Sequence, residues 1–195
     1  LESVNIPVVA AGGFRDGSGL AASIAWGACG IAMGTRFMMT QESPVPGKTK
    51  EAYISAGIDE IKITKKFDGL SHRLIFNKYI EKIDRSNPIS LFLMSITSAW
   101  KYKQITKASF GDLFKSFIAM LKGDDLTISQ SIMSANSPAI IQKAMVEGSP
   151  NEGAMPSGQV AGIITNLPSC KELIDQIMKE FNIAANNFKK IEEKL

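Results

Sequence analysis

Residues 6–37 read IPVVAAGGFRDGSGLAASIAWGACGIAMGTRF, and this stretch decides the fold class. Its first apolar run, residues 6–9, carries the β-branched side chains that strands favour. A second apolar run, residues 31–33, follows a segment with helical spacing that Asp16 or Ser18 can cap. Strand, helix and strand within about thirty residues form a βαβ unit. The second run lacks polar alternation, so the sequence predicts an α/β protein with a parallel sheet covered on both faces.

Each of the two predicted strands ends in glycine. Gly12-Gly13 follow the first strand, and Gly34-Thr35 follow the second. Because neighbouring parallel strands end at the same edge, their backbone N–H groups form a compact set of donors that suits a phosphate group. The alternative is that these glycines only make tight turns, but their pairing at one edge favours phosphate. No G-x-G-x-x-G follows the strand, so the unit is not a Rossmann fingerprint.

This stretch resembles the last two barrel strands of the nitronate monooxygenases, formerly called 2-nitropropane dioxygenases, which are FMN-dependent barrel enzymes. The same motifs are similar to those of FMN-dependent enoyl-acyl-carrier-protein reductases. The resemblance implies the C-terminal part of a TIM-type (β/α)8 barrel, its last two strands, followed by a mainly helical segment. It covers nearly the whole chain and continues through QESPVP (41–46), SANSP (134–138), EGSPNEGAMPSGQVAGII (147–164) and LPSCKELIDQIM (167–178).

The resemblance also implies which residues hold the cofactor. The FMN phosphate is expected on the amides of the two strand ends, namely Gly12, Gly13, Ala32, Met33, Gly34 and Thr35. The family often has glutamine where this chain has Ala32, so a side-chain contact there is lost and a backbone contact survives. Gln159, in Ser157-Gly158-Gln159, matches a family loop that returns to the flavin. The alternative for Gln159 is a helix-start residue that satisfies local backbone groups.

No catalytic residue is predicted in this chain. The family's catalytic histidine lies in a segment resembling GGHRG, upstream of the first strand, and residues 1–5 do not supply it. The only histidine is His72, which we expect to be a structural or surface residue in a helical region. The chain therefore resembles the C-terminal half of a longer enzyme, and we expect a fragment rather than a natural truncation.

The chain is expected to have three segments. Residues 1–44 are the last βαβ unit of an FMN-binding barrel, residues 45–150 are a helical insertion that covers the substrate, and residues 151–195 are a loop and helix that return to the barrel. Residues 60–70 are ambiguous and could include a short strand. Helical spacing or helix-start residues predict helices over 47–58, 71–83, 90–104, 109–122, 127–134, 137–148 and 169–190.

The resemblance implies FMN-dependent oxidation of alkyl nitronates, small-molecule substrates, with molecular oxygen. Two alternatives stay open: an FMN-dependent enoyl-acyl-carrier-protein reductase, and a non-catalytic fragment or interaction module. Whether the protein forms a homo-oligomer also stays open. A net charge of +3 over 195 residues is too small to indicate a nucleic acid partner. No apolar run approaches the roughly eighteen residues of a membrane span, so we expect a cytoplasmic protein. Cys29 and Cys170 fit neither a disulfide scaffold nor a zinc motif, so no metal is expected.

Overall fold

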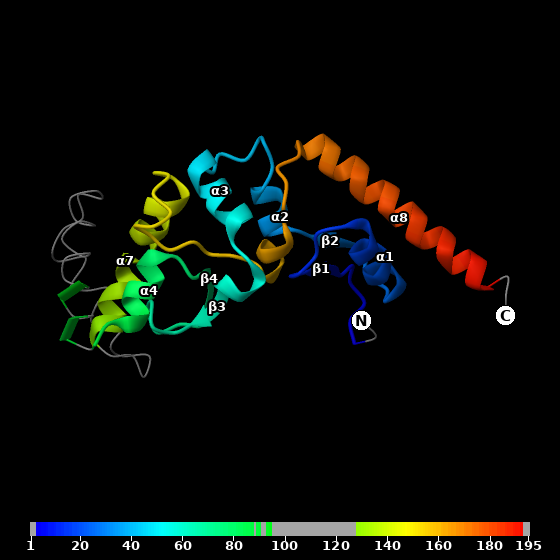
Figure 1. Ribbon diagram of the computed structural model, residues 1–195. Coiled ribbons are helices and arrows are strands. Elements are labelled where there is room, and N and C mark those ends of the chain that lie inside the picture. Colours follow the sequence, from blue (N-terminus) through cyan, green and yellow to red (C-terminus); the bar gives the residue numbers. More distant parts are fainter. Residues whose placement is uncertain (1–2, 88, 91–92, 95–127, 193–195) are drawn as a thin grey trace. The chain divides into compact units, whose positions relative to one another are not determined.

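The computed structural model describes residues 3–87, 89–90, 93–94 and 128–192. They fall into two compact units (Figure 1). Unit 1 comprises Leu1–Pro44 and Gly158–Leu195, and unit 2 comprises Val45–Ser157. Within the described residues, no helix is both long and apolar enough to cross a membrane. The predicted roles of segments 45–150 and 151–195 stay predictions.

Unit 1 begins with the predicted βαβ arrangement. Strand β1 (Val9–Ala11) leads through helix α1 (Gly17–Ala25) to strand β2 (Gly30–Ala32), and helix α2 (Gly34–Met38) follows directly. The two strands pair in parallel, with Ala11 opposite Ala32. Asp16 caps α1, since its side chain accepts a hydrogen bond from the amide of Gly19 at 2.9 Å. The parallel pairing and one of the two predicted caps are therefore confirmed.

The expectation of a sheet covered on both faces is wrong for the described structure. Val9 is 54% exposed, and Ile6, which lies before β1 rather than inside a strand, is 70% exposed. Only two strands pair in this sheet within the described residues, so each strand has a neighbour on one side only. With so small a sheet, α1 is the helix that packs against β2, and much of the apolar surface of β1 stays exposed.

The second part of unit 1 consists of the 3-10 helix η2 (Gln159–Ile163) and the long helix α8 (Cys170–Glu192). Ser169 caps α8, because its amide and hydroxyl both bond the Glu172 carboxylate and its Oγ accepts from the Glu172 amide. Helix α8 packs along α1 (Figure 1). The two backbones approach each other closely at Gly17, where an added Cβ would collide with α8. Buried Leu173 and Ile177 of α8 contribute to the core of this unit.

Unit 2 combines a hairpin with helices. Helix α3 (Gly47–Ser55) and the 3-10 helix η1 (Ile58–Glu60) precede strands β3 (Ile61–Thr64) and β4 (His72–Ile75), which pair antiparallel. Helices α4 (Lys78–Arg85) and α7 (Ile128–Met145) lie side by side (Figure 1). Their contact is part of a buried core formed by Phe67, Leu74, Ile80, Ile83, Ile140 and Ala154.

Two sequence predictions of helices need correction in unit 2. The helix predicted over 71–83 begins only at Lys78, because residues 72–75 form β4, with Leu74 and Ile75 in the core, and Asn77 caps the helix at the Ile80 amide. His72 is therefore a strand residue. The helix predicted to open at Pro138 instead runs unbroken from Ile128, with Pro138 inside it. The predicted segment 109–122 and most of 90–104 lie outside the described residues.

Candidate functional site

The backbone directly after β1 is exposed and carries no side chains at Gly12 and Gly13. Gly12 has a φ of +97° and Gly13 a φ of +80°, which is the left-handed region where a side chain is strained. A Cβ built on either residue would meet no other atom within 4 Å, and both residues are exposed. These two glycines therefore provide a turn whose amides another group can approach closely.

The end of β2 lies beside it. Since Ala11 pairs with Ala32, Gly12 and Met33 are the next residues along the same edge of the sheet. Met33 is the extended residue that precedes α2, and Gly34 and Thr35 are the first two residues of that helix. Amides in the first turn of a helix have no acceptor within the helix. A Cβ on Gly34 would also stand in open space. The structure thus brings the predicted residues of both strand ends to one edge.

The Ser157-Gly158-Gln159 loop meets this edge at Thr35. The Gly158 amide donates a hydrogen bond to Thr35 Oγ1 at 2.8 Å, and a Cβ on Gly158 would lie only 2.7 Å from that oxygen. The Thr35 hydroxyl accepts this bond and keeps its own proton to donate elsewhere. Gln159 is exposed and begins η2, which packs against α2. Gly158, which the sequence does not single out, is therefore the loop residue that contacts Thr35.

His72 has a partner in unit 2. Its Nε2 lies 2.8 Å from Oδ2 of Asp68, and its ring contacts Phe67 edge to face. Asp68 is almost fully buried and also accepts bonds from the Ser137 hydroxyl at 3.1 Å and the Leu70 amide at 3.0 Å. This carboxylate ties the hairpin to α7. The spacing of four residues between Asp68 and His72 was the only sequence signal for the pair.

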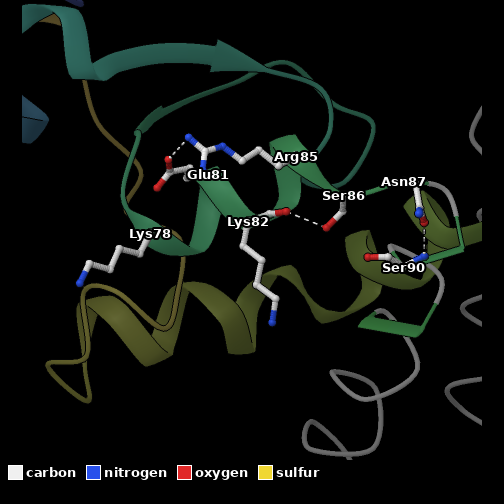
Figure 2. A pocket seen from close by; sticks show the side chains of 7 residues that line it. All are labelled: Lys78, Glu81, Lys82, Arg85, Ser86, Asn87 and Ser90. Atoms are coloured by element: carbon white, nitrogen blue, oxygen red, sulfur yellow. Dashed lines mark hydrogen bonds and ion pairs between the residues drawn. The ribbon is translucent and has the colours of Figure 1, made fainter.

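A basic groove follows one side of α4 (Figure 2). Its volume is about 460 Å³. Arg85 pairs with Glu81 at 2.6 Å, while Lys78 and Lys82 extend away from that pair. No ion pair of Lys78 or Lys82 occurs among the described residues of unit 2. The lining residues are Lys78, Glu81, Lys82, Arg85, Ser86, Asn87 and Ser90. The i, i+4 spacing of the two lysines could have indicated this feature from sequence.

Comparison with known proteins extends over most of the chain. Residues 1–180 match the model of a protein family described as nitronate monooxygenase. A relative from Rhodococcus jostii (strain RHA1) is 42% identical over 180 residues, which cover 92% of this chain and 51% of the relative. It is described as (3aS,4S,5R,7aS)-5-hydroxy-7a-methyl-1-oxo-octahydro-1H-indene-4-carboxyl-CoA dehydrogenase. A probable nitronate monooxygenase from Staphylococcus aureus (strain Newman) is 41% identical over 85 residues, or 44% of this chain and 24% of the relative.

Solved structures share the fold. FabK from Thermotoga maritima matches with a TM-score of 0.64 and 27% identity, over 97% of this chain and 49% of that one. A nitroalkane oxidase from Streptomyces ansochromogenes matches with a TM-score of 0.60 and 24% identity, over 96% of this chain and 42% of that one. The chain thus spans about half the length of the Rhodococcus relative and of FabK.

Proposed function

The chain belongs to the nitronate monooxygenase family, and we propose that the whole protein is an FMN-dependent oxidoreductase that acts on a coenzyme A thioester. The edge formed by the ends of β1 and β2 carries the flavin part of this proposal. The thioester part rests on the Rhodococcus relative, whose likeness covers 92% of the chain, against 44% for the Staphylococcus relative. The two strands would then be the last two of a (β/α)8 barrel.

The residues present fit an FMN phosphate. Gly12, Gly13 and Gly34 leave space where a Cβ would otherwise stand, so phosphate oxygens could reach their amides. Thr35 would add a hydroxyl that Gly158 holds in place. Ala32 and Met33 would contribute backbone groups only, and Gln159 would face the cofactor from the start of η2. When bound, FMN would supply the two-electron redox chemistry, while these residues bind and orient it.

A negative charge added at the end of β2 tests the flavin site. In Gly34→Asp the new carboxylate would stand at the proposed phosphate position, yet aspartate is favourable in the first turn of a helix and should not disturb folding. Gly30→Asp is the matched control, because Gly30 begins the same strand at its opposite end and also has open space around it. Like charges about 4 Å apart repel by roughly 1 to 4 kcal/mol, so we expect at least about fivefold weaker FMN binding for Gly34→Asp.

The readout is flavin fluorescence during titration of the 195-residue chain. A loss of affinity in Gly34→Asp that shrinks with added salt, with Gly30→Asp unchanged, supports the phosphate site. Equal affinities in the two variants would refute it. A chain that takes up no FMN at all would favour the non-catalytic or interaction module for this part of the protein.

Oxidation of alkyl nitronates is the second candidate, which the family description and the Staphylococcus relative favour. Reduction of an enoyl thioester is the third, and the resemblance of the strand-end motifs to those of the enoyl-acyl-carrier-protein reductases favours it. Assays of the whole protein separate the three. Flavin reduction by a saturated acyl-CoA supports our proposal, oxygen consumption with a nitronate supports the second candidate, and flavin reduction by NADH or NADPH with enoyl-thioester turnover supports the third.

A further inference from the structure

A second cavity lies within unit 1, lined by residues other than those of the proposed FMN site. Its volume is about 210 Å³. Its lining includes Arg15 and Asp16, which precede α1, Arg36 of α2, Asn166, and Glu180 of α8. Two arginines therefore line one cavity.

Arg36 carries a buried charge with neutral partners. The residue is only 6% exposed. Its Nη1 donates to the Asn166 carbonyl at 3.3 Å and its Nη2 to the Asn166 side-chain oxygen at 2.8 Å. Among the residues that the structure describes, no carboxylate comes within ion-pair distance of Arg36. Burial and the positive charge of Arg15 lower the pKa of Arg36, with Glu180 opposing. Buried charges are normally paired, so an anion in this cavity would supply the counter-ion that no carboxylate of the described residues provides.

The nearby carboxylates are engaged elsewhere. Glu180 Oε2 accepts from the Gly17 amide at 2.8 Å, and its Oε1 accepts from Gln176 at 2.8 Å. Asp16 caps α1 through Oδ1 and lies 3.4 Å from Arg15 Nε through Oδ2. Both carboxylates thus hold the start of α1.

Arg15 retains donors that can serve a ligand. Its Nη1 donates to the Ile163 carbonyl at 3.2 Å, and its side chain is partly exposed. A guanidinium has five N–H donors, and paired N–H groups match the oxygens of a phosphate. An anion between Arg15 and Arg36 would relieve the repulsion between their charges.

We propose that this cavity binds one oxyanion of the phosphate type, held by Arg36 from inside and by Arg15 from the rim. A volume of about 210 Å³ suits a phosphate group rather than an enclosed nucleotide. The source is therefore either a free phosphate or a phosphate at the end of a larger molecule. This site goes beyond the proposed function and does not depend on it.

Arginine side-chain NMR of the 195-residue chain tests the proposal. Inorganic phosphate is titrated at constant ionic strength while the Nε–Hε signals of Arg15 and Arg36 are followed. We expect both signals to shift and to saturate together. Arg15→Gln removes a charged hydrogen bond to the anion, so it should weaken phosphate binding about tenfold or more. Lys179→Gln is the control, because this lysine is exposed on α8 and does not line the cavity, and the phosphate affinity of that variant should stay within about twofold of the original.

Other outcomes also decide the matter. Arg36→Lys keeps the charge and removes the planar fork, and it should weaken binding too. Because Arg36 also holds Asn166, a misfolded Arg36 variant leaves Arg15→Gln as the deciding variant. Coenzyme A binding more tightly than phosphate, with the same arginine shifts, supports a ligand-borne phosphate, and equal binding supports the free anion. Phosphate that shifts Gly13 and Gly34 but neither arginine overturns the proposal, as does unchanged affinity in Arg15→Gln.

Discussion

Among the glycine-to-alanine substitutions in unit 1, Gly17→Ala should be the most destabilising. A Cβ at Gly17 would lie 2.1 Å from the Ile177 carbonyl oxygen, 2.4 Å from the Phe181 amide and 2.6 Å from the Cβ of Glu180. The first two contacts are with the backbone of α8, so no side-chain rotation relieves them. Helix α8 would have to move away by about 1.4 Å to restore ordinary contact distances near 3.5 Å.

The magnitude follows from two losses. Overpacking of this kind costs about 1 to 3 kcal/mol. The separation would also stretch the 2.8 Å bond from the Gly17 amide to the Glu180 carboxylate, and a bond to a charged group contributes about 1.5 to 3 kcal/mol. We expect unit 1 to lose about 3 to 5 kcal/mol in free energy of unfolding, against which the better helix propensity of alanine, about 1 kcal/mol, is small.

Urea unfolding followed by circular dichroism measures the change. Gly47→Ala is the matched control, because Gly47 is likewise the first residue of a helix, α3, and its Cβ would meet no atom within 4 Å. That variant should unfold at the same urea concentration or a slightly higher one. A Gly17→Ala chain within about 0.5 kcal/mol of the original would show that α1 and α8 do not pack as closely as described.

Two further predictions concern unit 2. Burial raises the pKa of Tyr53, so its stability contribution is intact below about pH 10 and declines as the pH rises toward the higher folded value. Tyr53→Phe should lose about 1 to 2 kcal/mol at neutral pH, because the Pro156 carbonyl loses its donor, and should show a smaller alkaline decline in urea midpoints. In the whole protein we expect the groove along α4 to bind the phosphates of a coenzyme A thioester, because Lys78 and Lys82 line it. Lys82→Glu should therefore raise KM for that thioester several-fold and leave kcat unchanged, while exposed Lys179→Glu changes neither. A changed kcat with constant KM would contradict a binding role for the α4 groove.

Local chemistry explains what could be predicted from sequence. The βαβ unit follows from two apolar runs around a capped amphipathic segment, and Asp16 caps as a short acidic side chain before a helix should. The cap at Ser169 follows for the same reason. The edge that gathers Gly12, Gly13 and Gly34 needs only the rule that parallel strands end together.

Long-range partners explain what could not be predicted. The helical pattern over 71–83 gives way to β4 because Ile61 pairs with Ile75, and the Ile75 amide bonds the Met155 carbonyl from far along the chain. Pro138 stays inside α7 because Ile140 and Ala144, further along the helix, are buried and their backbone packs against Gly153. The buried charge of Arg36 carries no local signal, since only folding places Asn166 beside it.

The glycines show the same division between local and long-range causes. Sequence cannot distinguish a glycine needed for packing from one needed for a ligand, but the space around each Cβ can. At Gly17, Gly153 and Gly158 an added Cβ would collide with other parts of the same unit, so these glycines are explained by packing. At Gly12, Gly13 and Gly34 the space is open, so the contacts within the described chain do not account for the missing side chain. Two of these three also need a positive φ, whereas Gly34 does not. Gly34 is therefore the position at which packing and backbone conformation both permit a side chain, and it is the sharpest place to ask whether a phosphate excludes one.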